Sequence, residues 1–309
     1  MVRGRLNMNK LVIDVGGTFI KYAIMDMEAN ILSKGSVPTP MDSREHFLNV
    51  LADLFEEALP DVDGIAISLP GNIDSSTGYV YTPGSLWYNA NTNVAQDLRA
   101  LIFDKTGKDV PVAIENDGKS AALAELWKGN LAGCGSGVVM ILGTGIGGGI
   151  ILDGKIVKGK NFFAGELSFL MKDVSKKGFD ECLAHACSTS ALTKKCAVAK
   201  KIEESEVDGF KVFEWFEQED PAIHEVFNEV VDAIAGTIYN MTCILNPERV
   251  LIGGGISKQP RLIEAIKEKT NTYYDSVPVP MPRTEVNVCK HFNDSNLIGA
   301  LYNYSLLYE

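Results

Sequence analysis

The feature that most constrains the fold is a glycine-rich stretch between apolar runs, LGTGIGGGIILDGKIVKG at residues 142–159, where five of seven consecutive positions from Gly143 are glycine. Its G-x-G-x-x-G spacing matches the dinucleotide-binding fingerprint, which requires a strand that leads into a helix. Here the glycines are followed by β-branched apolar residues and by Asp153-Gly154, a strong hairpin signal. The glycines therefore join strand to strand, and we reject dinucleotide binding.

The order of strand, glycine turn and strand occurs twice, first over residues 11–37 and again over residues 137–157. Periodicity predicts further strands and helices between and after them. The predicted strands cover 64–69, 110–114 and 249–252, and the predicted helices cover 43–59, 93–103, 119–127, 220–245 and 260–270. The recurrence suggests two related α/β halves, and 309 residues exceed the usual span of one hydrophobic core. A cleft between two such domains is a usual place for a ligand.

Composition excludes several classes of protein. With 46% hydrophobic and 22% charged residues, the chain is typical of globular proteins rather than disordered ones. A net charge of −11 gives no attraction to nucleic acid or to an anionic membrane, and no apolar run approaches the roughly 20 residues that span a bilayer. Six scattered cysteines do not resemble a disulfide framework. Residues 1–10 lack the apolar region of a secretory signal, and Met8 is an alternative start, so we expect a cytoplasmic protein.

The glycine turns are candidate anion sites, because backbone N–H groups without side chains form a concave positive surface. Any one of them is equally consistent with an ordinary tight turn, but all three follow apolar strands. Hydroxyls and a cation are added by Thr18, Thr144 and Lys21. We expect the turn Gly253-Gly254-Gly255 to accept the nucleoside end of a nucleotide. The turns are Asp14-Val15-Gly16-Gly17-Thr18, Gly143-Thr144-Gly145 and Gly253-Gly254-Gly255.

A polar triplet, Glu115-Asn116-Asp117, lies between a predicted strand and a predicted helix. A carboxylate at the positive end of a helix dipole tends to stay ionised, so it could accept a proton from an alcohol that attacks a phosphate. Helix capping by Asn or Asp explains the same residues, and position alone favours capping. The adjacent Gly118-Lys119-Ser120 ends like a P-loop, but Ala113 stands where that motif needs its first glycine, so we reject it.

Taken together, these motifs resemble the ROK family of repressors and sugar kinases, within the actin-like ATPase superfamily. The resemblance covers nearly the whole chain and is most specific from Gly143 to Glu166. It rests on the turns above together with Pro70-Gly71, Ala164-Gly165-Glu166 and Leu297-Ile298-Gly299-Ala300-Leu301. It implies an α/β fold of two actin-like, ribonuclease H-like domains with a hinge and an interdomain cleft. We expect residues 1–117 plus 296–309 to form the smaller domain and 118–295 the larger, with the C-terminal helix packed on the smaller domain.

The resemblance further implies an ATP-dependent sugar kinase that acts with Mg²⁺, in which Asp117 is the catalytic base. Asn116, Glu166, Gly71 and Phe169 would contact the sugar. The nucleotide and its phosphates would be bound by Asp14, which would also help hold Mg²⁺, and by Gly16, Gly17, Thr18, Lys21, Gly143, Thr144, Gly145, Gly254 and Gly255. The partner is thus a small sugar, and a homodimer is a family expectation.

Two departures from the family pattern concern zinc and the substrate. Phe169 replaces a zinc-ligating histidine, and the segment after it lacks the CxC motif and has Ala184 in place of a sugar-binding glutamate. The spacing of Cys182, His185, Cys187 and Cys196 is not that of a zinc site, so we expect no structural zinc. The same changes favour the β-glucoside kinases, which phosphorylate the 6-hydroxyl of a substituted glucose. Kinases of free glucose or N-acetylmannosamine stay open, with His185 restoring such a site.

Other functions are weaker interpretations. ROK repressors carry a helix-turn-helix ahead of the kinase-like body, and only ten residues precede the strand at Leu11. An inert sugar-binding module is disfavoured because Asp117 and both phosphate turns persist. Trp87 and Tyr88 are candidates for stacking on a sugar, although simple packing explains them equally well.

Overall fold

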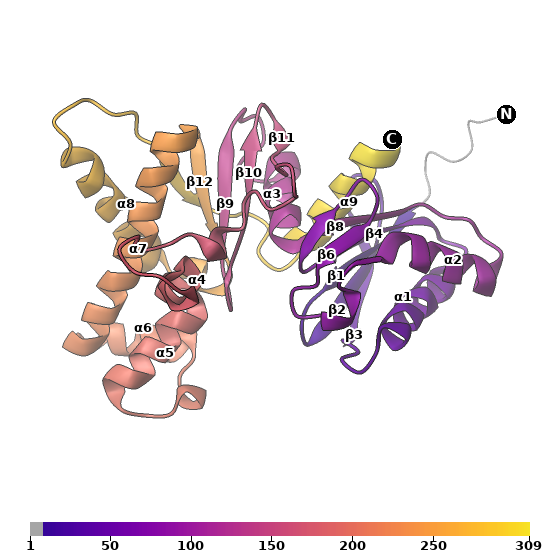
Figure 1. Cartoon of the computed structure of the whole chain (residues 1–309), viewed down its shortest axis with the longest axis horizontal. Coiled ribbons are helices and arrows are strands. Elements are labelled where there is room, and N and C mark those ends of the chain that lie inside the picture. The colour runs from indigo at the N-terminus through magenta and orange to yellow at the C-terminus, as the bar shows by residue number, and fades with distance from the viewer. Residues whose placement is uncertain (1–8) are drawn as a thin grey trace. The chain divides into compact units, whose positions relative to one another are not determined.

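The computed structural model describes residues 9–309 as an α/β protein that divides into two units (Figure 1). Unit 1 comprises the chain up to Trp127 together with Lys158–Ala164 and Asn293–Glu309, and unit 2 comprises Lys128–Val157 and Gly165–Phe292. Unit 1 thus extends past the expected boundary at residue 117 and includes a short segment, 158–164, that the sequence did not separate from the larger domain. The expectations about the first eight residues, including Met8 as a start, lie outside the described residues.

Unit 1 is built on a five-stranded sheet with the strand order β3-β2-β1-β4-β8. A smaller sheet, β5-β6-β7, follows β4 in the chain. The strands are β1 (Asn9–Val15), β2 (Phe19–Met25), β3 (Ile31–Pro38), β4 (Val62–Leu69), β5 (Asn72–Asp74), β6 (Tyr79–Thr82), β7 (Thr92–Asn93) and β8 (Val112–Asn116). The helices are α1 (Arg44–Ala58), α2 (Val94–Thr106), α3 (Asp117–Lys128) and α9 (Ser295–Tyr308).

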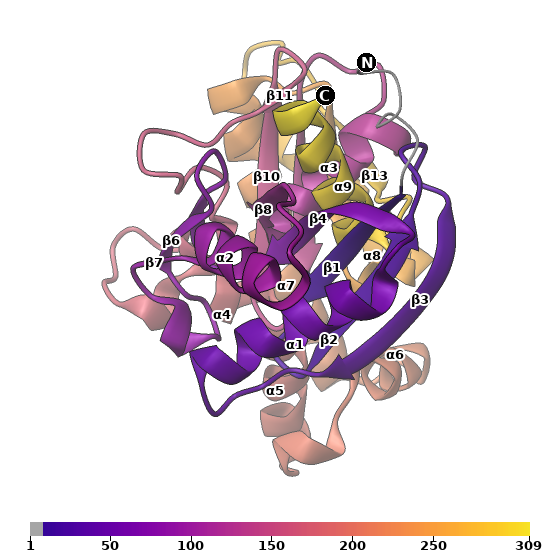
Figure 2. The same cartoon turned by 90° about the vertical axis from the view of Figure 1, so that its right-hand side faces the viewer.

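The large sheet of unit 1 is covered on both faces by helices (Figure 2). Bulky residues of alternate strand positions, such as Ile13 and Ile67, pack with α1 and α2 on one face, while small residues such as Ala66 and Ala113 pack with α9 on the other. Small side chains let α9 approach closely, and at Gly299 any Cβ would overlap the backbone of α3. The expected packing of the C-terminal helix on this sheet is therefore confirmed.

Unit 2 repeats the same plan in its strand order, β11-β10-β9-β12-β13. Its strands are β9 (Gly137–Leu142), β10 (Ile146–Leu152), β11 (Lys155–Ile156), β12 (Arg249–Gly253) and β13 (Glu285–Val288). Its helices are α4 (Leu183–Cys187), α5 (Thr189–Lys200), α6 (Gly209–Glu217), α7 (Pro221–Leu245) and α8 (Pro260–Asp275). In each five-stranded sheet, counted in the spatial order given, adjacent strands among the first three are antiparallel. The last two strands run parallel to the central strand. The two related halves predicted from the recurrence are confirmed.

The glycine-rich stretch differs from expectation in one respect. Gly147 and Gly148, which were expected in the turn, lie with Gly149 inside strand β10, so the turn itself is confined to residues 143–145. A Cβ on Gly148 would lie 2.6 Å from both the Leu167 side chain and a carbonyl of β9. These glycines therefore allow close packing on a strand rather than turning the chain. The predicted hairpin is present, and Asp153 and Gly154 both have positive φ, as a type I′ turn requires.

Candidate active site

The polar residues of unit 1 gather where its parallel strands end. Asp14 of β1 is paired in register with Ser68 of β4, and Ser68 with Glu115 of β8. These three residues thus form a row across adjacent strands, which are spaced about 4.8 Å apart. The glycine turn after β1 and the Asn116-Asp117 pair after β8 continue from this row. Carboxyl ends of parallel strands are the usual position of ligand sites in α/β folds.

Asp14 is a buried carboxylate with defined partners. Its side chain accepts a hydrogen bond from Asn296 Nδ2 at 2.9 Å, and Lys21 Nζ lies 3.9 Å from its Oδ2. Burial raises the pKa of Asp14, and the opposing effects of Asn296, Lys21 and Ser68 do not cancel this rise. The carboxylate is thus poorly solvated, and a cation or a further hydrogen-bond donor beside it would stabilise its charged form.

The glycine turn after β1 is rigid at its base and open at its tip. Gly16 N–H donates to Phe19 O at 3.0 Å, and Thr39 Oγ1 donates to Gly16 O at 2.7 Å. Gly17 and Thr18, at the tip, are exposed residues. The Ser85 hydroxyl faces the tip, because a Cβ on Gly17 would lie 3.7 Å from Ser85 Oγ. The conformation of this turn is compatible with the predicted anion site, which stays a prediction.

Asn116 and Asp117 are held at the start of α3 by different bonds. Asn116 Oδ1 accepts the Lys119 N–H at 3.0 Å, which is the capping bond that Asn or Asp was expected to make. Asp117 is the first residue of the helix, and its Oδ1 accepts from Asn116 Nδ2 at 2.9 Å and from Gly118 N–H at 2.8 Å. Asn116 therefore supplies the helix cap, and the two donors orient the carboxylate of the partly exposed Asp117.

Gly71 positions the Asn116 side chain through its backbone. Its carbonyl accepts from Asn116 Nδ2 at 2.9 Å. Gly71 has φ = 118°, and a Cβ there would overlap the Thr82 carbonyl. Nearby, a Cβ on Gly84 would lie 2.9 Å from the Pro70 ring. The backbone at Pro70-Gly71 is thus packed against the backbone of residues 82–84. This packing fixes the Gly71 carbonyl, which orients the Asn116 side chain.

The glycine turn of unit 2 is supported by two hydroxyl side chains. Gly143 N–H donates to Gly145 O at 3.0 Å, which closes the turn around the exposed Thr144. Ser168 Oγ accepts the Ile146 N–H at 2.8 Å, and Thr189, the first residue of α5, donates its hydroxyl to Leu142 O at 2.9 Å. Both supports come from segments more than twenty residues away in sequence, and they hold the Gly143–Gly145 turn in one conformation.

The third glycine turn lies beside the second. β12 and β9 are parallel neighbours, with Gly253 opposite Ile141, so both turns leave the same edge of the sheet. Gly254 has φ = 90°, and a Cβ there would overlap the Leu142 carbonyl. Gly255 is exposed and has nothing within 4 Å of its Cβ position. Gly143, Thr144, Gly145, Gly254 and Gly255 are therefore brought together, as the sequence predicted.

Phe169 belongs to an exposed aromatic cluster that we call the aromatic patch, composed of Phe169, Phe179 and His185. The ring of Phe169 is 48% exposed and lies 5.8 Å from that of Phe179, which in turn meets His185 edge-on at 4.7 Å. His185 thus packs against an aromatic ring. Glu166 precedes the short 3-10 helix Leu167–Phe169 that carries Phe169.

Cys187 and Cys196, which follow Phe179 in the sequence, are buried. Burial raises the pKa of the Cys187 thiol to about 12 and that of Cys196 to about 11. In residues 9–309, no group of three or more His, Cys, Asp or Glu side chains is arranged to hold a metal ion. The absence of structural zinc stays a prediction.

The two aromatic residues after Gly84, Trp87 and Tyr88, differ in burial. Tyr88 is buried against Phe47, and its hydroxyl donates to Pro40 O at 2.6 Å, so it belongs to the core of unit 1. The sugar-stacking interpretation of Tyr88 is therefore wrong, and packing explains the residue. Trp87 is 63% exposed.

The predicted site residues thus form two groups. Unit 1 holds Asp14, Gly16, Gly17, Thr18, Lys21, Gly71, Asn116 and Asp117, and unit 2 holds Gly143, Thr144, Gly145, Glu166, Phe169, Gly254 and Gly255. Sequence reasoning assigned no role to Ser85, Asn296, Ser168 or Thr189, whose only signal was a hydroxyl or amide next to a glycine-rich or helix-initiating segment. The expected hinge and cleft stay predictions.

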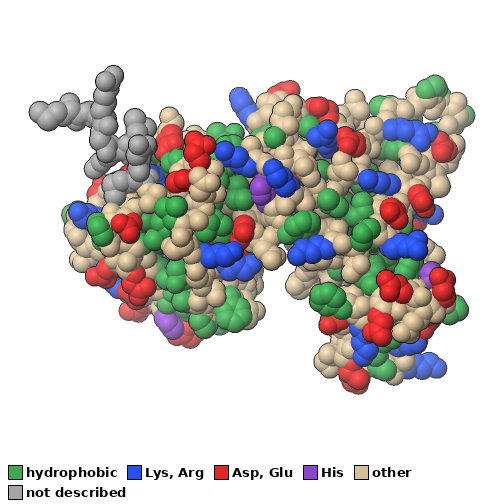
Figure 3. Space-filling model, turned by 180° about the vertical axis from the view of Figure 1, so that it is seen from behind, with side chains coloured by type: hydrophobic (Ala, Val, Ile, Leu, Met, Phe, Trp, Pro, Cys, Tyr) green, Lys and Arg blue, Asp and Glu red, His purple; other side chains and the backbone are tan. Residues whose placement is uncertain are grey.

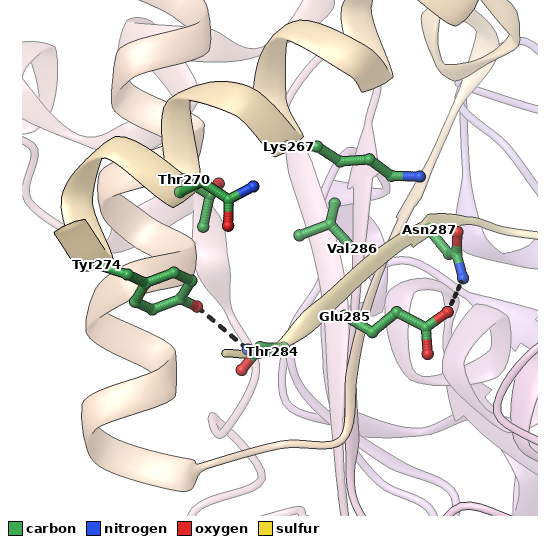
Figure 4. Close-up of a pocket in the computed structure, with 8 residues that line it drawn as sticks. Lys267, Thr270, Tyr274, Thr284, Glu285, Val286 and Asn287 are labelled. Carbon is green, nitrogen blue, oxygen red and sulfur yellow. Dashed lines mark hydrogen bonds between the residues drawn. The ribbon is translucent and has the colours of Figure 1, made fainter. Parts of the chain in front are cut away.

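We assign no binding site to two further features of the surface, a pocket in unit 2 and the distribution of charge. A pocket between α8 and β13 is lined by Lys267, Thr270, Asn271, Tyr274 and residues 284–287 (Figure 4), but Tyr274 and Thr284 both hydrogen-bond with Thr242 inside the core. On the face drawn in Figure 3, basic and acidic side chains are interspersed rather than gathered by sign. Within residues 9–309, no helix has the length and apolar character needed to cross a membrane.

The fold and these two groups define a class of protein, the actin-like ATPases, in which paired units of one topology carry phosphate-binding turns. Residues 10–305 match the ROK family, and the chain belongs to that family. It is 29% identical to a β-glucoside kinase of Listeria innocua over 96% of this chain and 97% of that one. It is 28% identical to a glucokinase of Halalkalibacterium halodurans over 93% and 92%. A ROK family protein from Streptococcus pneumoniae, solved with sucrose, has a TM-score of 0.86 at 25% identity over 97% and 98%.

Proposed function

We propose that this protein is an ATP-dependent sugar kinase that transfers the γ-phosphate to the 6-hydroxyl of a glucose unit. The observation that carries the proposal is the Asp117 carboxylate at the start of α3, oriented by Asn116 Nδ2 and Gly118 N–H. An oriented, ionised carboxylate can accept the hydroxyl proton as the sugar oxygen attacks phosphorus. Family membership and the kinase names of the relatives support this assignment.

The other predicted site residues of the two units would bind the phosphates, the nucleoside and the sugar. The N–H groups of the turns at residues 16–18 and 143–145 would bind phosphate oxygens and stabilise the charge that develops on them. The nucleoside would lie against the backbone of Gly254 and Gly255, where Gly255 has open space beside it. Glu166 and Asn116 would hold sugar hydroxyls, so that the 6-hydroxyl is aligned for attack.

Asp14 fits a role beside Mg²⁺. Its buried carboxylate has a raised pKa, and a neighbouring cation would restore the charged form. Magnesium is commonly held by one or two carboxylates with substrate phosphates and water, so a single carboxylate is a sufficient protein donor. When bound, the ion would neutralise the charge of the phosphate oxygens.

We further propose that the glucose unit is substituted at its anomeric oxygen, as in cellobiose or an arylglucoside. In the family pattern that side of the sugar faces a histidine and a glutamate, and here those positions are Phe169 and Ala184. The aromatic patch offers an exposed apolar surface for an aglycone. A site without polar groups there gains little from a free anomeric hydroxyl. Free glucose and N-acetylmannosamine are the alternative substrates.

The test is a substrate panel with ATP, reading ADP release for glucose, cellobiose, an arylglucoside, mannose and amino sugars. We expect kcat/KM for the two glucosides to equal or exceed that for glucose. Phe169→Ala should weaken the arylglucoside selectively, since burying about 50 Å² of aglycone at 25 cal/mol per Å² corresponds to roughly eightfold. A clear preference for a free sugar would exclude the glucoside assignment, and no transfer to any sugar would exclude the kinase assignment.

We also propose that the protein is a homodimer and acts in the cytoplasm, as the family resemblance implies. Light scattering coupled to size-exclusion chromatography gives the mass in solution. A monomeric mass across micromolar concentrations would contradict the dimer.

A further inference from the structure

The segment Lys158–Ala164 has no role in the function proposed above, although it belongs to unit 1 while its neighbours in sequence belong to unit 2. It is a closed loop, because Ala164 N–H donates to Lys158 O at 3.2 Å. It docks on the small sheet of unit 1 at two points besides Lys158. Asn72 Nδ2 donates to Asn161 O at 2.8 Å, and the Phe162 ring stacks on Tyr81 with centroids 5.9 Å apart.

Lys158 carries the third and most buried attachment of this loop. Its Nζ lies 3.1 Å from Glu115 Oε2, and the Glu115 side chain is fully buried. Oε2 accepts no hydrogen bond from the described residues 9–309, and the Lys158 ammonium group is the cation beside it. Lys158 also donates to the hydroxyl of Ser75, which is itself buried. A buried carboxylate without a nearby cation is strongly unfavourable, so Lys158 is what allows Glu115 to be charged at this position.

Glu115 connects this ion pair to the candidate base. Its Oε1 accepts the N–H of Asn116 at 2.8 Å, so the side chain folds over the last peptide of β8. Because β8 is the last strand of its sheet and is buried, the carboxylate accepts from a backbone group that needs a partner there. Asn116 then donates to Asp117 Oδ1 and caps α3. A continuous series of contacts therefore runs from Lys158 through Glu115 and Asn116 to Asp117.

We propose that Lys158 is a positioning residue for Asp117: it holds the Glu115 carboxylate in the orientation that fixes the Glu115-Asn116-Asp117 turn. The proposal rests on the proposed function, in which Asp117 is the base. Because Lys158 would act through Glu115 rather than on a substrate, its removal should lower kcat and leave both KM values nearly unchanged. Misplacement of a reacting group by about 1 Å can cost on the order of 10²-fold in rate.

The variants are Lys158→Met, Lys158→Arg and the double variant Lys158→Met with Glu115→Gln. Lys158→Met should lower kcat by about 10- to 100-fold with KM for ATP and for sugar within about threefold of the wild type. Lys158→Arg should retain most of kcat. The double variant leaves no uncompensated buried charge, so it should recover thermal stability while kcat stays at least about tenfold low. It also replaces Lys158→Met in the assay if the single variant does not fold.

The matched control is Lys10→Met, which breaks another buried lysine ion pair of unit 1, Lys10 with Asp63 at 2.7 Å, at the opposite end of the strands. It should lose stability and keep kcat. Hydrogen exchange gives a readout that does not depend on activity. Amides of residues 116–120 should exchange faster in Lys158→Met and in the double variant, but not in Lys10→Met.

The inference is overturned if Lys158→Met keeps the kcat of the wild type, if the double variant recovers kcat together with stability, or if exchange at 116–120 is unchanged. An inactive wild-type protein across the sugar panel would instead contradict the proposed function, and the exchange measurement would still decide the role of Lys158.

Discussion

Replacing Asp117 by asparagine is the most direct test of the proposed chemistry, because the change removes a charge and almost no volume. In the structure, Asp117 Oδ1 accepts two hydrogen bonds, from Asn116 Nδ2 and from Gly118 N–H. An asparagine can keep its carbonyl oxygen in that position and satisfy the same two donors. The variant should therefore fold, with a loss in the free energy of unfolding of less than about 1 kcal/mol.

The effect on catalysis should be much larger than the effect on stability. An amide cannot accept the proton that the sugar hydroxyl must lose, and general-base catalysis contributes 10² to 10⁴ in rate. Since each factor of ten corresponds to 1.36 kcal/mol, the activation barrier should rise by about 2.7 to 5.5 kcal/mol. Binding of ATP should change little, because Asp117 is not part of either phosphate-binding turn.

The assay is ADP release at saturating ATP and sugar, with nucleotide affinity measured separately by calorimetry. Asp208→Asn is a matched control, since Asp208 caps α6 by accepting the Lys211 N–H and Asn caps as well as Asp does. We expect that control to keep the kcat of the wild type. If Asp117→Asn turns over at the wild-type rate, Asp117 is not the base. If it is inactive because it is unfolded, the reasoning about its hydrogen bonds is wrong.

Two further predictions concern stability and metal. Burial raises the pKa of Asp14 above its ordinary value of 3.8, so the folded protein binds that proton more tightly than the unfolded chain and loses stability as pH rises through the raised pKa. Asp14→Asn should thus have a higher Tm than the wild type at pH 7, lose this difference near pH 3, and have at least about tenfold lower activity. Thermal scans at both pH values and the ADP assay measure these effects. An equal or lower Tm at pH 7 would contradict the prediction. The purified protein should hold no stoichiometric zinc and keep its Tm in a strong chelator. Structural zinc contributes directly to folding, so its removal would lower the Tm. One zinc per chain by metal analysis would show that the interpretation of Cys182 and Cys187 is wrong.

Features set by neighbouring residues could be predicted from the sequence. Apolar runs interrupted by glycine turns predicted every strand of the two five-stranded sheets except β13, and Asp153-Gly154 marked a hairpin because only certain residues adopt positive φ at low cost. The position of Asp117 followed in the same way from a strand that ends and a helix that begins. Helices α4, α5 and α6 were not predicted, because none has a long periodic pattern of apolar residues. Buried side chains of all three belong to the same hydrophobic core as those of α7.

What only the tertiary structure decided is the set of partners that act across large separations in sequence. Asn296 meets Asp14 because α9 packs on the sheet of unit 1, 282 residues after the strand it supports. Lys158 meets Glu115 because one loop of the later sequence docks on the earlier unit. Gly147 and Gly148 were expected in a turn but lie in strand β10, where Gly148 packs closely against Leu167 and β9. Local propensity acts through bonds to near neighbours, whereas these contacts depend on strand register and helix packing, which no short stretch of sequence contains.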